Sequence, residues 1–137
     1  MASPVMSDLQ SCQTDDITRR PARFLLFYGL PTAVLIASQF FTRDAVLIAW
    51  IWAAGMTVMG LACLANARRC HRVHCYFTGP WMLLMAALFL LYATGWLPLS
   101  GTVFAWLVNG AWIGILVLWF GSEMVWGRYF GLKNDRG

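Results

Sequence analysis

The sequence predicts an all-α integral membrane protein, an antiparallel bundle of four transmembrane helices with both termini on one side. The first observation is composition: 60% of the 137 residues are hydrophobic and 12% are charged, against roughly 45–50% and 25% in soluble domains. A soluble domain of this size has too much surface for so few charges. The other two observations are four uncharged apolar runs and basic residues that gather between alternate runs.

The four runs give expected spans at about residues 24–41, 45–66, 80–97 and 102–122. Each uncharged run holds about 18 residues or more, roughly what a helix rising 1.5 Å per residue needs to cross ~30 Å of hydrocarbon. The runs lack the alternation of a barrel strand, so helices are the expected spanning form. Acidic residues precede the first run and no small-x-small site follows it, so we expect no cleaved signal there.

Local signals punctuate the runs in chain order. Pro31 predicts a kink in the first span, because proline lacks an N–H group and clashes with the preceding turn. Residues 42–44 leave room only for a tight turn. Small residues in the second span permit close helix packing, and the fourth span holds a G-x-x-x-G motif, Gly110 to Gly114. Asn109 beside it needs a polar partner in the bundle or in a second copy.

The basic residues predict orientation. Nine of the ten Lys and Arg residues fall on one face of the four-span topology, and Arg43 lies on the other. The positive-inside rule makes the basic face cytoplasmic. We therefore expect a bacterial-type inner (plasma) membrane protein with a polar flexible cytoplasmic tail (1–22), a membrane domain (23–126) and a short basic cytoplasmic tail (127–137). The net charge of +4 then indicates contact with the lipid bilayer rather than with nucleic acid.

The segment 67–79 carries the densest chemistry, since Cys70, His71, His74 and Cys75 fall within six residues. Such tracts suit Zn, Cu(I) or other thiophilic ions. We expect Thr78 to cap the third span, with proline in its first turn. If the second span also continues as a helix through this segment, Cys70/His74 and His71/Cys75 form i,i+4 pairs. The two thiols then point apart, and a linear Cu(I) or Hg(II) site requires local unwinding.

Three further residues lie on the same face. Cys63 precedes Cys70 by seven residues, about two helical turns deeper, where it could accept an ion from the bilayer side. Glu123 could complete a coordination shell or pair with Arg72 or Arg69, and the ion pair is favoured. Cys12 lies in the tail, where it could exchange a metal or form a disulfide. For the Cys/His cluster a structural disulfide is the least expected use, because the cytoplasm is reducing.

In size, spans and the motif Cys70-His71-Arg72-Val73-His74-Cys75, the chain resembles the small bacterial mercuric-ion transport proteins of the inner membrane. The resemblance implies a thiol hand-off of a soft metal ion at the cytoplasmic face. That family carries a Cys-Cys pair in its first helix. This chain has no cysteine there, so the ion-uptake role of that pair does not carry over.

The sequence thus predicts a protein that binds or transports a soft metal ion (Hg, Cu(I) or Zn), without organic cofactor or enzymatic activity. The expected ligands are Cys70, His71, His74, Cys75, Cys63 and Glu123. The alternative is a non-catalytic accessory or assembly subunit of a larger membrane complex. Gly110 and Gly114 would then pack against a partner helix or a second copy. An enzyme acting on lipid or quinone is disfavoured, because no paired carboxylates, Ser/His/Asp set or phosphate loop is visible.

Overall fold

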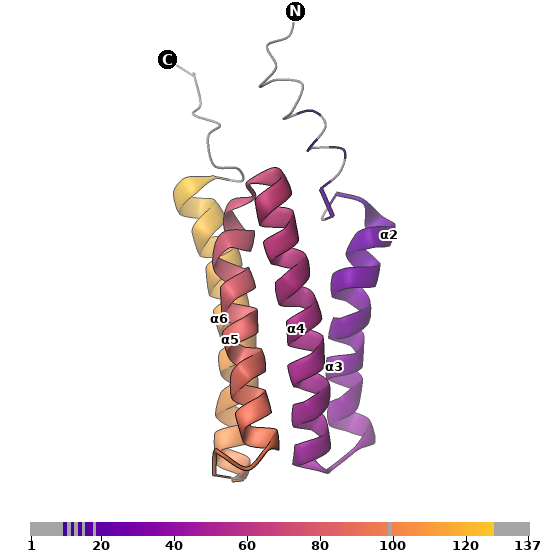
Figure 1. The fold of residues 1–137 in the computed structure, drawn as a ribbon, viewed down its shortest axis with the longest axis vertical. Coiled ribbons are helices and arrows are strands. Elements are labelled where there is room, and N and C mark those ends of the chain that lie inside the picture. The colour runs from indigo at the N-terminus through magenta and orange to yellow at the C-terminus, as the bar shows by residue number, and fades with distance from the viewer. Residues whose placement is uncertain are drawn as a thin grey trace, which may run out of the picture.

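The computed structural model describes residues 19–98 and 100–127 together with Gln10, Cys12, Thr14, Asp16 and Ile17. This part of the chain is all-helical and forms four antiparallel rods (Figure 1). The rods are α2–η1–α3 (Pro21–Phe24, Leu25–Gly29, Leu30–Phe41), α4 (Ala45–Cys70), α5 (Val73–Ala93) and α6 (Gly101–Trp126). Each rod is long and apolar enough to cross a membrane. The predicted four-helix architecture is therefore confirmed, and residues 128–137 of the expected basic tail lie outside the described part.

The first rod is interrupted, as Pro31 predicts, but the interruption is a turn of π-helix rather than a simple kink. The N–H of Leu30 donates to the carbonyl of Leu25 across the five residues of η1. Pro31 follows at the start of α3, where its missing N–H group costs least. The rod ends at Phe41, and Asp44 caps α4 by accepting from Val46 N at 3.0 Å. The expected tight turn at 42–44 is thus confirmed.

The third helix differs from the prediction. Segment 67–79 is not a loop: α4 runs on to Cys70, only His71 and Arg72 form the turn, and α5 begins at Val73 and ends at Ala93. His71 reverses the chain with φ of 49°, so neither predicted i,i+4 pair forms. Thr78 does not cap the helix. It lies inside α5, and its hydroxyl donates to the His74 carbonyl. Pro80 also lies inside α5.

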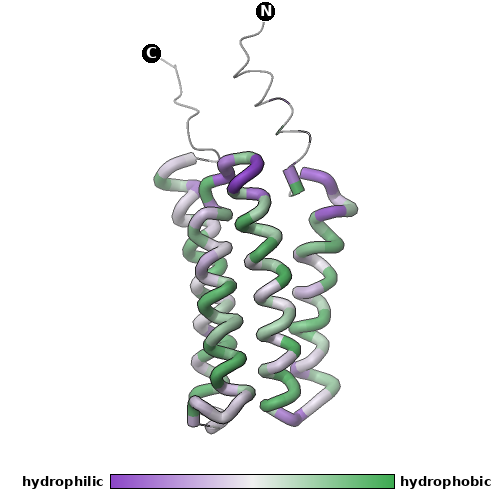
Figure 2. Tube along the Cα trace, viewed as in Figure 1, coloured by the Kyte–Doolittle hydropathy of each residue, from purple (hydrophilic) through white to green (hydrophobic). Residues whose placement is uncertain are grey.

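Packing follows the chain order. The α4–α5 pair is the most extensive, α6 packs on α5, and α3 packs on α4. Glycine permits the closest approach in the α4–α5 pair, because a Cβ at Gly60 would lie 3.1 Å from the carbonyl oxygen of Gly79. Hydrophobic residues cover the middle of all four rods, and hydrophilic residues gather at the end that holds the α4–α5 turn (Figure 2). The first rod and α6 therefore flank the central pair.

Helix α6 keeps most of its surface exposed. Gly114 packs against Trp81 of α5 so closely that a Cβ would lie 2.2 Å from the indole ring, whereas Gly110 faces open space. Of the two glycines in the G-x-x-x-G motif, Gly114 thus packs within the chain and Gly110 does not. The Asn109 amide donates to the Ala105 carbonyl of its own helix at 2.8 Å and remains exposed, so it makes no contact across the bundle in the described part.

Candidate thiol and polar site

A cluster of polar side chains, the polar cluster, fills the end of the bundle beside the α4–α5 turn. Its members come from the N-terminal segment, α4, the turn, α5 and α6: Asp16, Asn66, Arg72, His74 and Glu123. Asp16 and His74 are fully buried, and the Glu123 side chain is 20% exposed. Buried charges require partners, because burying an unpaired ion costs several kcal/mol.

Arg72 is the centre of this cluster. Its Nη1 lies 2.6 Å from Asp16 Oδ2, and its Nη2 lies 3.2 Å from Glu123 Oε1. The predicted Arg72–Glu123 ion pair is confirmed. The Asp16 partner was not predicted, because the sequence places Asp16 in a flexible tail. One guanidinium thus joins the N-terminal segment to α6.

The N-terminal segment is held against the bundle near Asp16. The Asn66 amide donates to Asp16 Oδ1 at 3.0 Å, and Ile17 N donates to Asn66 Oδ1 at 3.4 Å. Cys12 is bonded to Cys70 at the end of α4, with 5.3 Å between their Cα atoms. A disulfide, the least expected use of Cys70, is therefore present in this structure. Cys12, Asp16 and Ile17 thus contact α4 and the α4–α5 turn beside the polar cluster.

His74 connects the polar cluster to a thiol. Its Nδ1 lies 2.7 Å from Glu123 Oε1 and 3.3 Å from Arg72 Nε, and its Nε2 lies 3.3 Å from Cys75 Sγ. The two Nδ1 contacts require opposite tautomers, since Arg72 Nε only donates and the Glu123 carboxylate only accepts. The shorter contact favours an Nδ1 proton donated to Glu123, which excludes the Arg72 Nε hydrogen bond and leaves Nε2 to accept from the Cys75 thiol. The Trp119 indole stacks on the imidazole at 4.2 Å. A thiol, an imidazole and a carboxylate in this order can move a proton off sulfur.

Two thiols meet at this point, and we call Cys63 and Cys75 the thiol pair. Cys63 belongs to α4 and Cys75 to α5, both are free and fully buried, and their thiols interact. Tyr28 of the first rod places its hydroxyl 3.2 Å from Cys63 Sγ. The Asn66 amide nitrogen lies 3.7 Å from Cys75 Sγ. The thiol pair therefore lies between three of the four rods and the polar cluster.

The six-residue ligand set predicted from the sequence does not assemble. Cys63, His74, Cys75 and Glu123 lie near one another, but Cys70 is taken by the disulfide. His71 lies in the turn, exposed, with Nδ1 3.0 Å from the Tyr76 hydroxyl. Within the described residues, no three or more His, Cys, Asp or Glu side chains are grouped to hold a metal ion. The two-residue turn ends α4 at Cys70, so Cys70 and His71 do not share a helix with His74 and Cys75 of α5.

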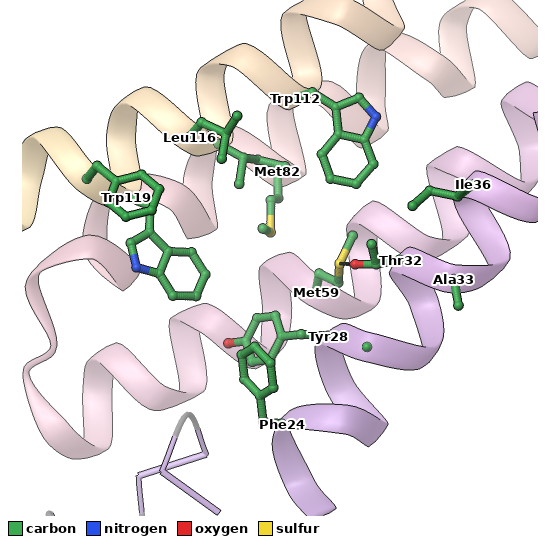
Figure 3. Close-up of a pocket in the computed structure, with 13 residues that line it drawn as sticks. Phe24, Tyr28, Thr32, Ala33, Ile36, Met59, Met82, Trp112, Leu116 and Trp119 are labelled. Carbon is green, nitrogen blue, oxygen red and sulfur yellow. Dashed lines mark hydrogen bonds between the residues drawn. The ribbon is translucent and has the colours of Figure 1, made fainter. Parts of the chain in front are cut away.

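An apolar cavity, the lateral groove, adjoins the thiol pair. It has a volume of about 530 Å³. The first rod lines it from Phe24 to Ile36, α6 lines it from Trp112 to Phe120, and Met59 and Met82 form its floor (Figure 3). Tyr28 belongs both to the groove wall and to the thiol pair's surroundings, since its hydroxyl contacts Cys63. The groove and the thiols are thus separated by single aromatic side chains.

No protein-family profile, curated protein or solved structure matches this chain.

Proposed function

We propose that this is a multi-pass protein of a bacterial-type inner membrane that binds a soft, thiophilic metal ion at the thiol pair, with both termini in the cytoplasm. One observation carries the proposal: two free thiols from different helices interact in a fully buried site beside an imidazole that can accept a proton. Thiolate sulfur is the preferred ligand of soft ions such as Cu(I). The ion is cargo, handed on or held at the cytoplasmic end.

The arrangement favours a two-coordinate ion. Binding joins the metal to Cys63 Sγ and Cys75 Sγ and releases both thiol protons. His74 Nε2 accepts one while Glu123 holds the Nδ1 proton, and the other passes to water at the cytoplasmic end of the bundle. A bis-thiolate complex of Cu(I) carries one negative charge and that of Hg(II) none, so the imidazolium or Arg72 balances what remains. Structural Zn sites take four ligands, which the thiol pair does not offer, so Cu(I) and Hg(II) are the favoured ions.

The experiment compares two double variants in metal titrations. Purified protein in lipid nanodiscs receives Cu(I) from a competing chelator, or Hg(II), and bound metal is counted by elemental analysis. Cys63→Ser with Cys75→Ser should abolish stoichiometric binding, whereas Cys12→Ser with Cys70→Ser, the matched control, should retain it. Equal binding by the two double variants, with helicity unchanged in both, would refute the proposal.

The orientation has a redox consequence. Cytoplasmic thiols reduce most disulfides, so the proposal places Cys12 and Cys70 as a dithiol in the growing cell and as the bonded pair under oxidising conditions. Alkylation of cells before lysis, followed by mass spectrometry, measures this state. A bonded pair in unstressed cells would instead support the opposite orientation, with the termini on the oxidising side.

A second candidate function is an accessory subunit or homo-oligomer. The observation that favours it is the exposed Asn109, because a carboxamide in the middle of a membrane span gains from a partner helix. Gly110 beside it leaves open space for close approach. Oxidative cross-linking of Asn109→Cys in membranes distinguishes the partners: a dimer of this chain indicates self-association, and a mixed product indicates another subunit.

A further inference from the structure

The lateral groove opens sideways, between two rods that are not sequence neighbours. The first rod packs on α4 and α6 packs on α5, so the groove separates the outer helices and reaches the surface between them. Its wall is aliphatic and aromatic apart from Tyr28 and Thr32, and Thr32 is already turned toward the Met59 sulfur at 3.7 Å (Figure 3). A ligand there must therefore be apolar over most of its length.

The length of the groove selects a class of ligand. From Phe24 to Ile36 the first rod advances about 18 Å at 1.5 Å per residue. One leaflet supplies half of a hydrocarbon core of roughly 30 Å, which is about 15 Å. The groove thus matches the depth of one leaflet, and it starts at the end of the rod where the polar surface begins (Figure 2).

Positively charged arginine side chains lie at the outer end of the groove. Arg19, Arg20 and Arg23 precede Phe24, the first groove residue. All three are exposed, and Arg20 Nε also donates to the Thr14 carbonyl at 2.9 Å. Basic side chains at the cytoplasmic surface attract anionic lipid headgroups, each contributing about fivefold in affinity. An apolar slot of leaflet depth that ends at a cationic surface is complementary to a lipid with a negative headgroup.

We propose that the lateral groove holds one acyl chain of an anionic phospholipid from that leaflet, with the phosphate against Arg20 and Arg23. The proposal rests on the membrane insertion proposed above, and it adds a bound lipid beside the thiol site. The chain lies against Tyr28 and Trp119, the two aromatic residues that separate the groove from Cys63 and His74. A seated lipid therefore keeps this side of the thiol pair closed to the bilayer.

A helix of a second copy would enter the groove only in part. A helix about 10 Å across and about 18 Å long occupies roughly 1,400 Å³, more than twice the 530 Å³ of the groove. The groove volume lies instead within the range of roughly 300–1,000 Å³ in which proteins bind small ligands. The volume thus favours a single acyl chain over a helix.

The test is native mass spectrometry of the full chain, released from mild detergent after incubation with phosphatidylglycerol or with phosphatidylcholine of the same acyl chains. We expect one tightly retained phosphatidylglycerol. Ala33→Trp, which fills the groove, should remove it, whereas Val34→Trp, an exposed neighbour outside the groove, should not. Arg20→Gln with Arg23→Gln should lower the preference for the anionic lipid by about 25-fold, and Arg43→Gln at the opposite end should leave it unchanged.

Two results would overturn the proposal: wild-type protein that retains both lipids equally, or Ala33→Trp protein that retains phosphatidylglycerol as well as the wild type does. Carbonate extraction of cell membranes tests insertion separately, and metal titration of Ala33→Trp tests the thiol pair separately. A failed lipid site is therefore distinguishable from a failure of the function proposed above.

Discussion

Arg72 offers the sharpest test of how the terminal segment is held. Arg72→Met keeps an unbranched side chain in the turn but removes the guanidinium that pairs with Asp16 at 2.6 Å and with Glu123 at 3.2 Å. The Asp16 side chain is 0% exposed and that of Arg72 is 10% exposed, so the free-energy cost of breaking a buried ion pair applies here, not that of an exposed pair. Removing one partner of a buried pair costs about 3–5 kcal/mol, whereas exposed pairs contribute about 0–1 kcal/mol.

The assay is reversible unfolding in mixed micelles, followed by circular dichroism across a denaturant series. The matched control is Arg69→Met, which removes an exposed arginine one turn earlier and should change the free energy of unfolding by less than about 1 kcal/mol. Adding Asp16→Asn to Arg72→Met should recover part of the loss, because the uncompensated buried charge is then gone. A single variant as stable as the control, or a double variant with no recovery, would refute the buried-pair reasoning.

Two further predictions concern helix packing and the disulfide. Gly114→Ala should destabilise the α5–α6 contact by about 1–3 kcal/mol because its Cβ meets Trp81. Gly110→Ala should stabilise the chain by about 0.5–1 kcal/mol through helix propensity. Thermal unfolding of both variants measures the two changes, and equal shifts in Tm would contradict the prediction. Replacing Cys12 and Cys70 with serine should speed maleimide labelling of the thiol pair, because the disulfide that holds Cys12 to the end of α4 is then lost. Labelling rates are measured by mass spectrometry. Unchanged rates would show that the disulfide does not control access of the reagent to the thiol pair.

The number of rods was predictable because uncharged runs of this length have few alternatives to helix. The boundaries of the third helix were not. Gly79 and Pro80 have the character of a helix start, yet α5 begins seven residues before Pro80. Val73, His74 and Cys75 are each fully buried against neighbouring rods, and this tertiary burial outweighs the local signal.

The sequence predicted where in the bundle the candidate site lies, but not which residues pair within it. Clustering of Cys and His, together with Glu123 on the same face, correctly indicated where polar chemistry gathers. The pairing was not predictable, since it depends on contacts far apart in sequence: Asn66 meets Asp16 across 50 residues, and Cys12 meets Cys70 across 58. Nothing local to Asp16 marks it in the sequence as a carboxylate that becomes buried.

The two-residue turn at His71 and Arg72 fixes a rotational register. Each residue added to a helix turns its side chains by about 100° around the axis, and this turn has no slack to absorb an insertion. One extra residue before His74 would therefore swing Cys75 away from Cys63 and Asn66, leaving the bundle intact but its sulfur atoms apart. An insertion anywhere in the nine-residue interval between Asn66 and Cys75 would therefore separate the two thiols. The connection between Thr94 and Ser100 lies at the opposite end of the rods, so a change in its length would leave the two sulfur atoms together.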